Sequence, residues 1–424
     1  MVSPFVILLL LIALGPVAFP KYWKRNYKSI SIFLSALVIG YYIFIKKNIH
    51  DIETAGFDYF SFISLLSALF VVSGSIFIKL DFKPSPFVNT LILFTGAVLA
   101  NFIGTTGASI LLIRPFIQLN EHRIKPYLIV FFIFLVSNVG GGLTPMGPPL
   151  FLGYLRGIPF EWMIHNIFYQ WLFVVGLLLT IFIFFDSRNN KKSVLPFQKR
   201  TGTLRIEGLK NLIWLILIML TVFLDPAKIH WLPSFHGHSF VREILQGVLL
   251  FACYIFCDKK ILVRNKFHWE PILEVGFLFF GIFFTMIPAL TFLSDFTNQY
   301  RSTEYFNPGI IFWSTGIASS FLDNAPAYLT FLTVVMSYFN LAATDNSSVY
   351  LFSQNPEYII YLKAISMAAV FFGAITYIGN GPNFIVKSIA EDMRVEMPSF
   401  FRYIWSYAFP ILLPILALIW LIFL

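Results

Sequence analysis

The feature that most constrains this chain is its series of long apolar runs, which are separated by short polar loops. A helix needs about 20 consecutive apolar residues to cross the hydrocarbon core of a bilayer. Hydrophobic residues make up 58% of the chain and charged residues 12%, against about 25% charged residues in soluble domains. We therefore predict an all-α integral membrane protein whose partner is the lipid bilayer. The runs lie at 2–19, 29–45, 58–79, 87–118, 127–155, 163–185, 211–224, 239–257, 271–293, 309–339, 358–386 and 401–424.

The same composition excludes several classes of function. The formal net charge is +9, but the basic residues lie in short loops, so we expect no nucleic-acid binding. The sequence contains no Walker A pattern, nucleophile elbow or zinc-protease motif. Cys253 and Cys257 lie one turn apart in an apolar run, and we interpret them as small hydrophobic residues. We predict that the protein is not an enzyme and holds no cofactor, apart from transported Na⁺ and H⁺.

Four of the apolar runs are longer than one crossing requires and contain Gly, Pro, Asn and Thr near their middle. They are 87–118, 127–155, 309–339 and 358–386. Unpaired backbone groups are costly in hydrocarbon, so such breaks persist only where protein, water or an ion satisfies them. We therefore predict re-entrant hairpins at 87–118 and 309–339, and broken helices at 127–155 and 358–386.

The basic residues predict the orientation of the chain, because short loops rich in Lys and Arg favour the cytoplasm. The segment 187–210 carries seven basic residues against Glu207 alone. Placing it in the cytoplasm also places there the basic loops 20–28, 119–126, 258–270 and 387–400. This arrangement requires the first hairpin to enter from the cytoplasm and the second from outside.

The two halves of the chain also resemble each other. A constant offset places Phe102 on Phe321 when LANFIGTTGAS (99–109) is laid over ASSFLDNAPAY (318–328). A second offset places Thr144 on Thr376 in the following interrupted runs. We predict an inverted-repeat secondary transporter with its site near the bilayer midplane. The expected parts are N-terminal transmembrane helices at 1–57, a first repeat at 58–186, a cytoplasmic linker at 187–210 and a second repeat at 211–424.

Small polar residues cluster around the breaks of each half. Hydroxyl and amide oxygens suit Na⁺, whereas helix N-termini at the same breaks favour an anionic group. The alternative is that small polar residues merely allow close helix packing. The first cluster contains Asn101, Thr105, Thr106, Ser109, Ser137, Asn138 and Thr144, and the second contains Ser319, Ser320, Asp323, Asn324, Thr376, Asn380 and Asn383.

Asp323 is the most informative of these residues, because a charged Asp near the bilayer centre costs roughly 2.5–3.5 kcal/mol on insertion scales. Positions three and four residues away hold no basic partner. The carboxyl group can hold a cation when ionised and a proton when neutral, which is the simplest basis for exchange between the two. The alternative is a structural Asp that caps a helix in the hairpin.

The motifs SNVGGGLTPMGPPLF (137–151), SSFLDNAPAY (319–328) and GAITYIGNGPNF (373–384) resemble those of the ion-transporter superfamily. That superfamily includes NhaD-type sodium/proton antiporters, citrate and dicarboxylate transporters and arsenite permeases. The resemblance covers roughly 85–400 and implies two hairpins, two broken helices, a separate scaffold and a homodimer in the bacterial inner membrane. It also implies a cation and substrate site at the hairpin tips and breaks, with Asp323, Asn324 and Thr376 as Na⁺ ligands.

The sequence departs from the superfamily pattern at one place. Relatives commonly carry an acid between the Gly and Pro of the first broken helix, where this chain reads Gly147-Pro148-Pro149. Asp323 then carries more of a cation mechanism. We predict a sodium/proton antiporter, because no basic residue lies at 104–109 or 319–328 to neutralise an organic anion. The alternative is a Na⁺- or H⁺-coupled citrate or dicarboxylate transporter. A third class, a membrane enzyme or assembly scaffold, predicts a constellation of catalytic acids or His in the spans or a soluble module, and the sequence shows neither.

Overall fold

A computed structural model describes residues 2–192, 202–224, 233, 239–299 and 306–424. Within these residues, seven helices are long and apolar enough to cross a membrane. The prediction of an α-helical membrane protein is confirmed. The seven spans are Pro20–Lys46, His50–Gly74, Pro86–Leu119, Trp162–Asn190, Glu270–Thr297, Pro356–Ile375 and Phe400–Phe423.

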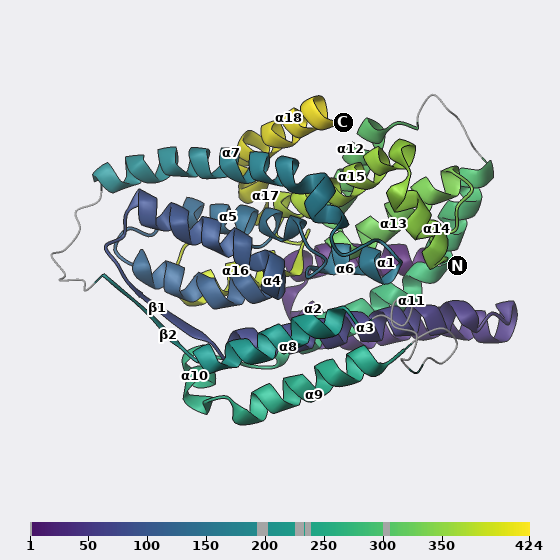
Figure 1. Ribbon diagram of the computed structural model, residues 1–424, viewed down its shortest axis with the longest axis horizontal. Helices are drawn as coiled ribbons and strands as arrows, with labels where there is room; N and C mark the ends of the chain where they lie inside the picture. The colour runs from purple at the N-terminus through teal and green to yellow at the C-terminus, as the bar shows by residue number, and fades with distance from the viewer. Residues whose placement is uncertain (1, 193–201, 225–232, 234–238, 300–305) are drawn as a thin grey trace.

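The helices run roughly along the long axis of an elongated body (Figure 1). α1 (Ser3–Ala18), α2 (Pro20–Gly40), α3 (His50–Gly74), α8 (Leu212–Val222), α9 (Val241–Phe256) and α11 (Glu270–Gln299) gather on one side, with the short α10 (Lys259–Arg264) at an end. The other elements form the rest of the body. They include α7 (Trp162–Lys192), α14 (Asn346–Gln354), α17 (Phe400–Tyr403) and α18 (Leu413–Phe423).

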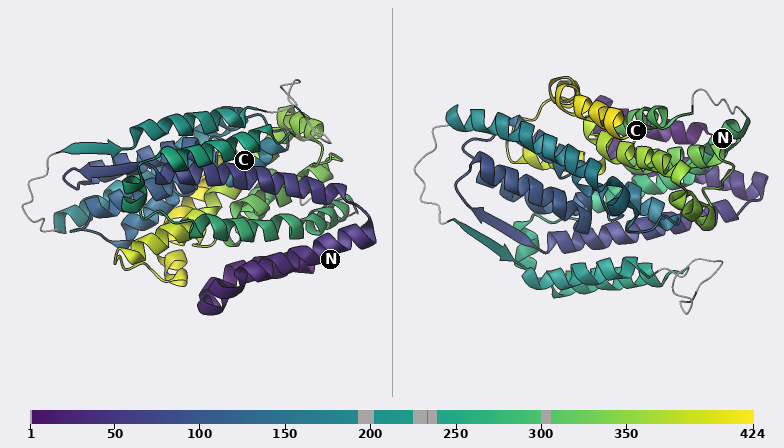
Figure 2. Two further views of the ribbon diagram at one scale, coloured as in Figure 1. Left: turned by 90° about the horizontal axis from the view of Figure 1, so that it is seen from below. Right: turned by 45° about the horizontal axis from the view of Figure 1, so that its top comes forward.

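One element has no counterpart in the sequence prediction. β1 (Phe77–Asp81) pairs in antiparallel register with β2 (Thr203–Glu207), so that Lys79 lies opposite Arg205. The ribbon lies at one end of the body in both views of Figure 2. Part of the predicted linker 187–210 is therefore the strand β2, which is hydrogen-bonded to β1 in the segment before α4.

α4 (Pro86–Leu119) is a helical hairpin rather than one straight helix. Its backbone leaves helical geometry at Gly104, where φ is 70° and ψ is 161°. Asn89 Nδ2 donates to Asn120 Oδ1 at 2.8 Å, and Asn120 Nδ2 donates to Asn89 Oδ1 at 2.9 Å. A straight helix would separate these residues by about 45 Å. The chain therefore reverses at Gly104, and the two arms lie side by side.

The second hairpin consists of α12 (Pro308–Phe321) and α13 (Asn324–Tyr338), joined at Leu322 and Asp323. Its open end is closed by stacking of Phe306 on Tyr338, with ring centroids 3.6 Å apart. β1, which precedes α4, and α14, which follows α13, lie at opposite ends of the body (Figure 1). The two hairpins therefore enter the body from opposite ends.

Each hairpin is followed by a helix that breaks in the middle. In the first half, α5 (Pro126–Leu135) gives way to a short 3₁₀ turn at Val139–Gly142 before α6 (Pro148–Leu155) begins. In the second half, α15 (Pro356–Phe371) passes through a 3₁₀ turn at Phe372–Ile375 before α16 (Gly381–Asp392). Both breaks occur within the runs that the sequence marks with Gly, Pro, Asn and Thr.

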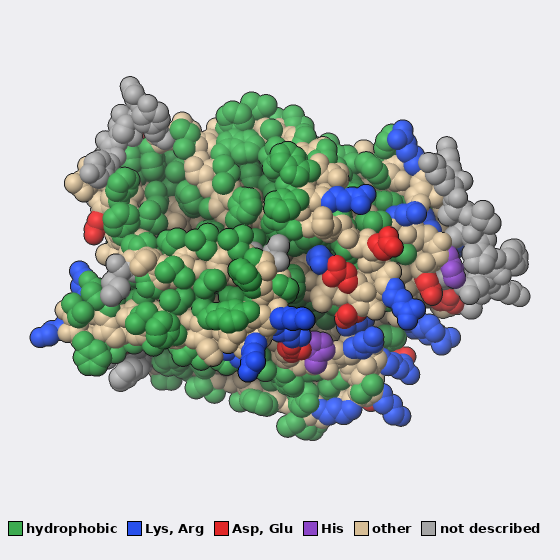
Figure 3. Space-filling view, turned by 180° about the vertical axis from the view of Figure 1, so that it is seen from behind, with side chains coloured by type: hydrophobic (Ala, Val, Ile, Leu, Met, Phe, Trp, Pro, Cys, Tyr) green, Lys and Arg blue, Asp and Glu red, His purple; other side chains and the backbone are tan. Residues whose placement is uncertain are grey.

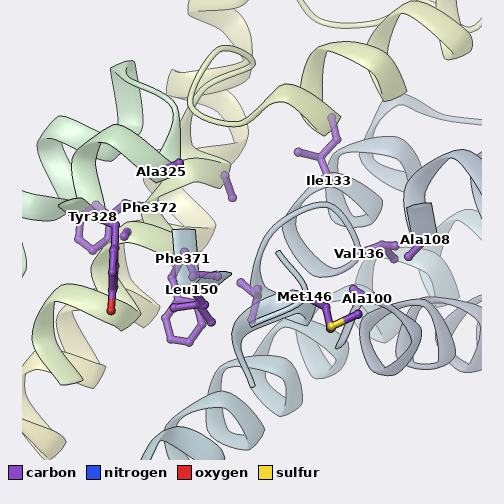
Figure 4. Packing of buried hydrophobic residues seen from close by; sticks show 14 of the residues in the cluster. Ala100, Ala108, Ile133, Val136, Met146, Leu150, Ala325, Tyr328, Phe371 and Phe372 are labelled. Carbon is purple, nitrogen blue, oxygen red and sulfur yellow. The ribbon is translucent and has the colours of Figure 1, made fainter. Parts of the chain in front are cut away.

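Apolar side chains from both hairpins and both broken helices fill the centre of the molecule. Figure 4 labels the buried residues Ala100, Ala108, Ile133, Val136, Met146, Leu150, Ala325, Tyr328, Phe371 and Phe372. On the outside, one face shows mostly hydrophobic side chains, whereas Lys, Arg, Asp and Glu concentrate toward one end (Figure 3). This distribution is typical of a protein whose apolar belt contacts lipid.

Candidate functional site

The tip of the first hairpin is fixed to the first break by hydrogen bonds. Thr144 Oγ1 donates to the carbonyl oxygen of Asn101, and the backbone N–H of Leu143 donates to Asn101 Oδ1 at 2.9 Å. A Cβ placed on Gly104 would lie 2.8 Å from the carbonyl oxygen of Met146. The positive φ at Gly104 and this close approach both favour glycine there. The hairpin tip and the unwound backbone after Gly142 are therefore in direct contact.

The second half repeats this bond with the residues that the sequence alignment pairs. Thr376 Oγ1 donates to the carbonyl oxygen of Ser320 at 2.5 Å, and the alignment places Ser320 on Asn101 and Thr376 on Thr144. The Thr376 hydroxyl also accepts from the N–H groups of Ile378 at 3.2 Å and Gly379 at 3.0 Å. It is fully buried. Its donor and both lone pairs are thus used within the protein, so a Na⁺ ion could bind this hydroxyl only if one bond opened.

Asp323 lies between the N-termini of two helices. Its Oδ1 accepts from the N–H of Ala325 at 3.3 Å, which caps α13, and its Oδ2 accepts from the N–H of Gly381 at 3.3 Å, at the start of α16. The side chain is partly exposed. Within the described chain, no Lys or Arg forms an ion pair with it. The capping geometry expected from the alternative interpretation is present, and binding of a cation or proton remains a prediction.

Ser319 and Asn324 connect the second hairpin to the second break. Ser319 Oγ donates to the carbonyl oxygen of Ala369 at 2.6 Å. With its amide nitrogen turned toward its neighbours, Asn324 donates to the carbonyl oxygens of Ala369 at 3.0 Å and Gly379 at 2.7 Å. Asn324 is buried against Gly373, where no larger residue would fit. The amide therefore joins the tip to both sides of the 3₁₀ turn.

Three asparagine amides join the two halves at the breaks. Asn138 Nδ2 donates to Asn383 Oδ1 at 2.7 Å. Asn380 Nδ2 donates to the carbonyl oxygen of Ser137 at 2.8 Å and to Asn138 Oδ1 at 3.1 Å. Asn383 Nδ2 donates in turn to the carbonyl oxygens of Gly373 and Thr376. We call Asn138, Asn380 and Asn383 the amide bridge.

The remaining predicted residues lie around this bridge, although not all in the same way. Ser109 Oγ and Ser137 Oγ are 2.8 Å apart and fully buried. Thr105 is buried one turn closer to the tip, and its hydroxyl has no hydrogen-bond partner among the described residues. Ser320 Oγ donates to its own helix at Gly316. Thr106 is partly exposed, so it is the member of the first cluster with the weakest structural connection to the break.

Three ion pairs whose side chains are largely or fully buried were not predicted from the sequence. Arg156, at the end of α6, pairs with Asp58 on α3, Arg242 pairs with Glu243 at 2.6 Å, and Arg123 pairs with Asp186 at 2.5 Å. Charged residues inside apolar runs were the available signal, since such residues are rare in membranes unless paired. Asp58 and Glu243 lie in predicted runs, and Asp186 directly follows one.

Comparison with known proteins identifies the class of this molecule. A family model described as "Putative citrate transport" matches residues 1–424. The chain belongs to this family. No curated protein matches it. The match confirms the resemblance to ion-transporter families, and together with the apolar helices it makes the chain a multi-pass membrane transporter. It favours the citrate interpretation over the sodium/proton antiporter that we predicted first.

Proposed function

We propose that the protein is a cation-coupled transporter of citrate-like carboxylates, which binds its substrate where the hairpin tips meet the two breaks. The observation that carries the proposal is the convergence of helix N-termini at these breaks. α13 and α16 both begin at the Asp323 carboxyl group, which is negative until a cation or proton binds it, and α6 begins without a side-chain cap beside the tip of the first hairpin. N-terminal helix ends carry about half a positive charge each and favour anions.

The missing acid of the first break supports an anionic substrate. The residue before α6 is Gly147, and no side chain caps this helix. α16 likewise begins without a side-chain cap from its own N-cap residue, Asn380. A carboxylate at Gly147-Pro148 would compete with the substrate for the positive end of α6. Its absence leaves no negative side chain at this helix end. Pro148 and Pro149 supply no N–H donors, so a substrate carboxylate would be attracted here by the helix dipole.

Asp323 is the proposed coupling residue, with Asn324 as a further Na⁺ ligand and with Thr376 joining when one of its hydroxyl hydrogen bonds opens. A carboxyl group between two helix N-termini is stabilised when ionised, and a bound Na⁺ or H⁺ would reduce its repulsion of an anionic substrate. The second candidate function is sodium/proton antiport at the same acid. It is favoured by the lack of basic residues at 104–109 and 319–328. We place either activity in an inverted-repeat homodimer of the bacterial inner membrane.

Reconstitution in proteoliposomes tests the proposal. Uptake of radiolabelled citrate is measured with Na⁺, Li⁺, K⁺ or a pH gradient imposed separately, while a trapped pH dye follows protons. We expect citrate uptake that requires one of the cations. Proton movement driven by Na⁺ without citrate uptake would overturn the proposal in favour of antiport.

Asp323→Asn tests the coupling residue, because it removes the charge while keeping one of the two acceptor oxygens, and Asn also caps helices well. We expect loss of cation dependence with the folded protein retained. The matched control is Asp345→Asn, since Asp345 caps α14 by accepting from the N–H groups of Ser347 and Ser348. Hydrogen bonds from Ser348 hold the pKa of Asp345 below its usual value, so this control also removes a charged cap. It should leave transport unchanged.

A further inference from the structure

Within the amide bridge, Asn380 has one polar atom that the protein leaves unsatisfied. The side chain is 2% exposed, and its Oδ1 has no hydrogen-bond partner in the described part of the chain. A buried acceptor without a donor costs about 1–3 kcal/mol. Such an atom is expected to meet a donor or a cation at some stage of the protein's cycle.

The orientation of this amide is fixed by its neighbours. Asn380 Nδ2 donates to the carbonyl oxygen of Ser137 and to Asn138 Oδ1. Asn138 Oδ1 is itself an acceptor here, because Asn138 Nδ2 donates to Ile133 and Asn383. Rotating the Asn380 amide would place its oxygen against two acceptors and lose both bonds. The unsatisfied oxygen therefore points away from the bridge.

A second unsatisfied atom belongs to the first hairpin. Thr105 Oγ1 is buried without a partner among the described residues. Thr105 precedes Ser109 by one helical turn, so both lie on the same face of the hairpin arm. Ser109 contacts Ser137, whose carbonyl oxygen accepts from Asn380. Thr105 and Asn380 are thus connected through Ser109 and Ser137.

These two atoms differ in the chemistry that they require. A hydroxyl can donate to a carboxylate oxygen, whereas the Asn380 oxygen can only accept. An ionised carboxylate offers acceptors alone. In citrate, the single donor among the ionised groups is the central hydroxyl. The unsatisfied Asn380 oxygen is therefore complementary to the hydroxyl group of such a carboxylate.

We propose that Asn380 recognises the hydroxyl group of a hydroxylated carboxylate and makes the transporter selective for citrate over its analogue without the hydroxyl. This inference rests on the proposed function and specifies that Asn380 recognises the hydroxyl group of the substrate. Asn380 is covered in the conformation described, so the substrate reaches it when the hairpin tips separate from the breaks.

The test compares citrate with tricarballylate, which carries the same three carboxylates without the hydroxyl. Dissociation constants of both are measured by calorimetry on the purified wild type and on Asn380→Ala. We expect the wild type to prefer citrate by about tenfold or more, because the analogue leaves the buried acceptor unpaired. In Asn380→Ala the preference should fall toward one.

A further variant separates recognition from structure. Asn383→Ala breaks the amide bridge at Asn138 but leaves the Asn380 oxygen, so it should retain the preference. Where the alanine variant does not fold, the comparison of citrate with tricarballylate on the wild type still tests the inference. A loss of preference in Asn383→Ala equal to that in Asn380→Ala would overturn the inference.

The outcomes for the wild type distinguish the two proposals. Citrate binding without uptake overturns the proposed transport function and leaves the hydroxyl preference to be read from the dissociation constants. Citrate uptake with equal affinity for tricarballylate overturns the role of Asn380 alone. A change in Na⁺ dependence in Asn380→Ala, with the citrate preference retained, would assign the oxygen to a cation and also overturn the role.

Discussion

The two equivalent threonines provide a quantitative test of the repeat, because one of them makes more hydrogen bonds than the other. Thr376 makes three through its hydroxyl, to Ser320, Ile378 and Gly379. Among the described residues, Thr144 makes one hydrogen bond through its hydroxyl, to the carbonyl oxygen of Asn101. Replacing either by Val keeps the shape of the side chain and removes the hydroxyl. The structure therefore predicts unequal costs for the same substitution.

The expected magnitudes follow from the groups left unpaired. Hydrogen bonds between membrane helices contribute about 0.6 kcal/mol on average and up to about 1.7, and an abandoned buried partner costs about 1–3 kcal/mol. Thr376→Val abandons three backbone groups, so we expect a loss of about 2–5 kcal/mol in the free energy of unfolding. Thr144→Val should cost about 0.6–2 kcal/mol. Thr376→Ser loses only a methyl group, about 1 kcal/mol.

The assay is unfolding of the purified protein in mixed micelles with increasing sodium dodecyl sulfate, followed by tryptophan fluorescence. Thr376→Val should be the least stable of the three variants. The reasoning is refuted if Thr376→Val is no less stable than Thr376→Ser, or if Thr144→Val costs more than Thr376→Val.

Three further substitutions test particular contacts. Gly104→Ala should prevent correct docking of the first hairpin, since the positive φ is strained for alanine and its Cβ would lie 2.8 Å from a carbonyl oxygen. Transport activity and thermal stability are measured, and the control is Gly176→Ala, where the added Cβ has no atom within 4 Å. Asp186→Asn should lower the free energy of unfolding by about 3–5 kcal/mol, because Arg123 is left as a buried charge without its partner. A loss no larger than that caused by substituting an exposed surface residue would contradict this. Arg156→Gln should cost less than Asp186→Asn by the same measurement, because its ion pair is partly exposed.

Several features of the fold could be predicted from the sequence because they have a local cause. Gly and Pro inside long apolar runs have few explanations in a membrane, and the breaks after Leu135 and Phe371 lie where these residues predict them. The alignment of Asn101 with Ser320 and of Thr144 with Thr376 also identified two residue pairs that make the same hydrogen bond. Both features could be predicted because short sequence motifs were enough to identify them.

Other features depend on contacts between distant segments, which no local pattern reveals. The pairing of β1 with β2 joins residues 77–81 to 203–207, and neither strand is long enough to show a clear alternation. The ion pair between Arg156 and Asp58 was missed for a related reason, because Arg156 directly follows an apolar run, where a basic residue is typical of an anchor at the membrane surface. A basic residue near a helix end fits both positions, and only the tertiary structure supplies the partner.

The position of α6 relates these missed contacts to the candidate site. This helix has eight residues, so its N-terminus at the first hairpin tip and its C-terminus are close together. Near the C-terminus, the Tyr154 hydroxyl donates to the carbonyl oxygen of Val222 on α8 at 2.7 Å, and Arg156 pairs with α3. The N-terminus of α6, at the candidate site, is thus separated only by the length of this helix from its contacts with α3 and α8. So short a helix has little freedom to bend. If the tip of the first hairpin moves relative to α3 and α8 and α6 moves with it, the contacts of Tyr154 and Arg156 must break. If α6 stays in place, the tip must separate from Met146.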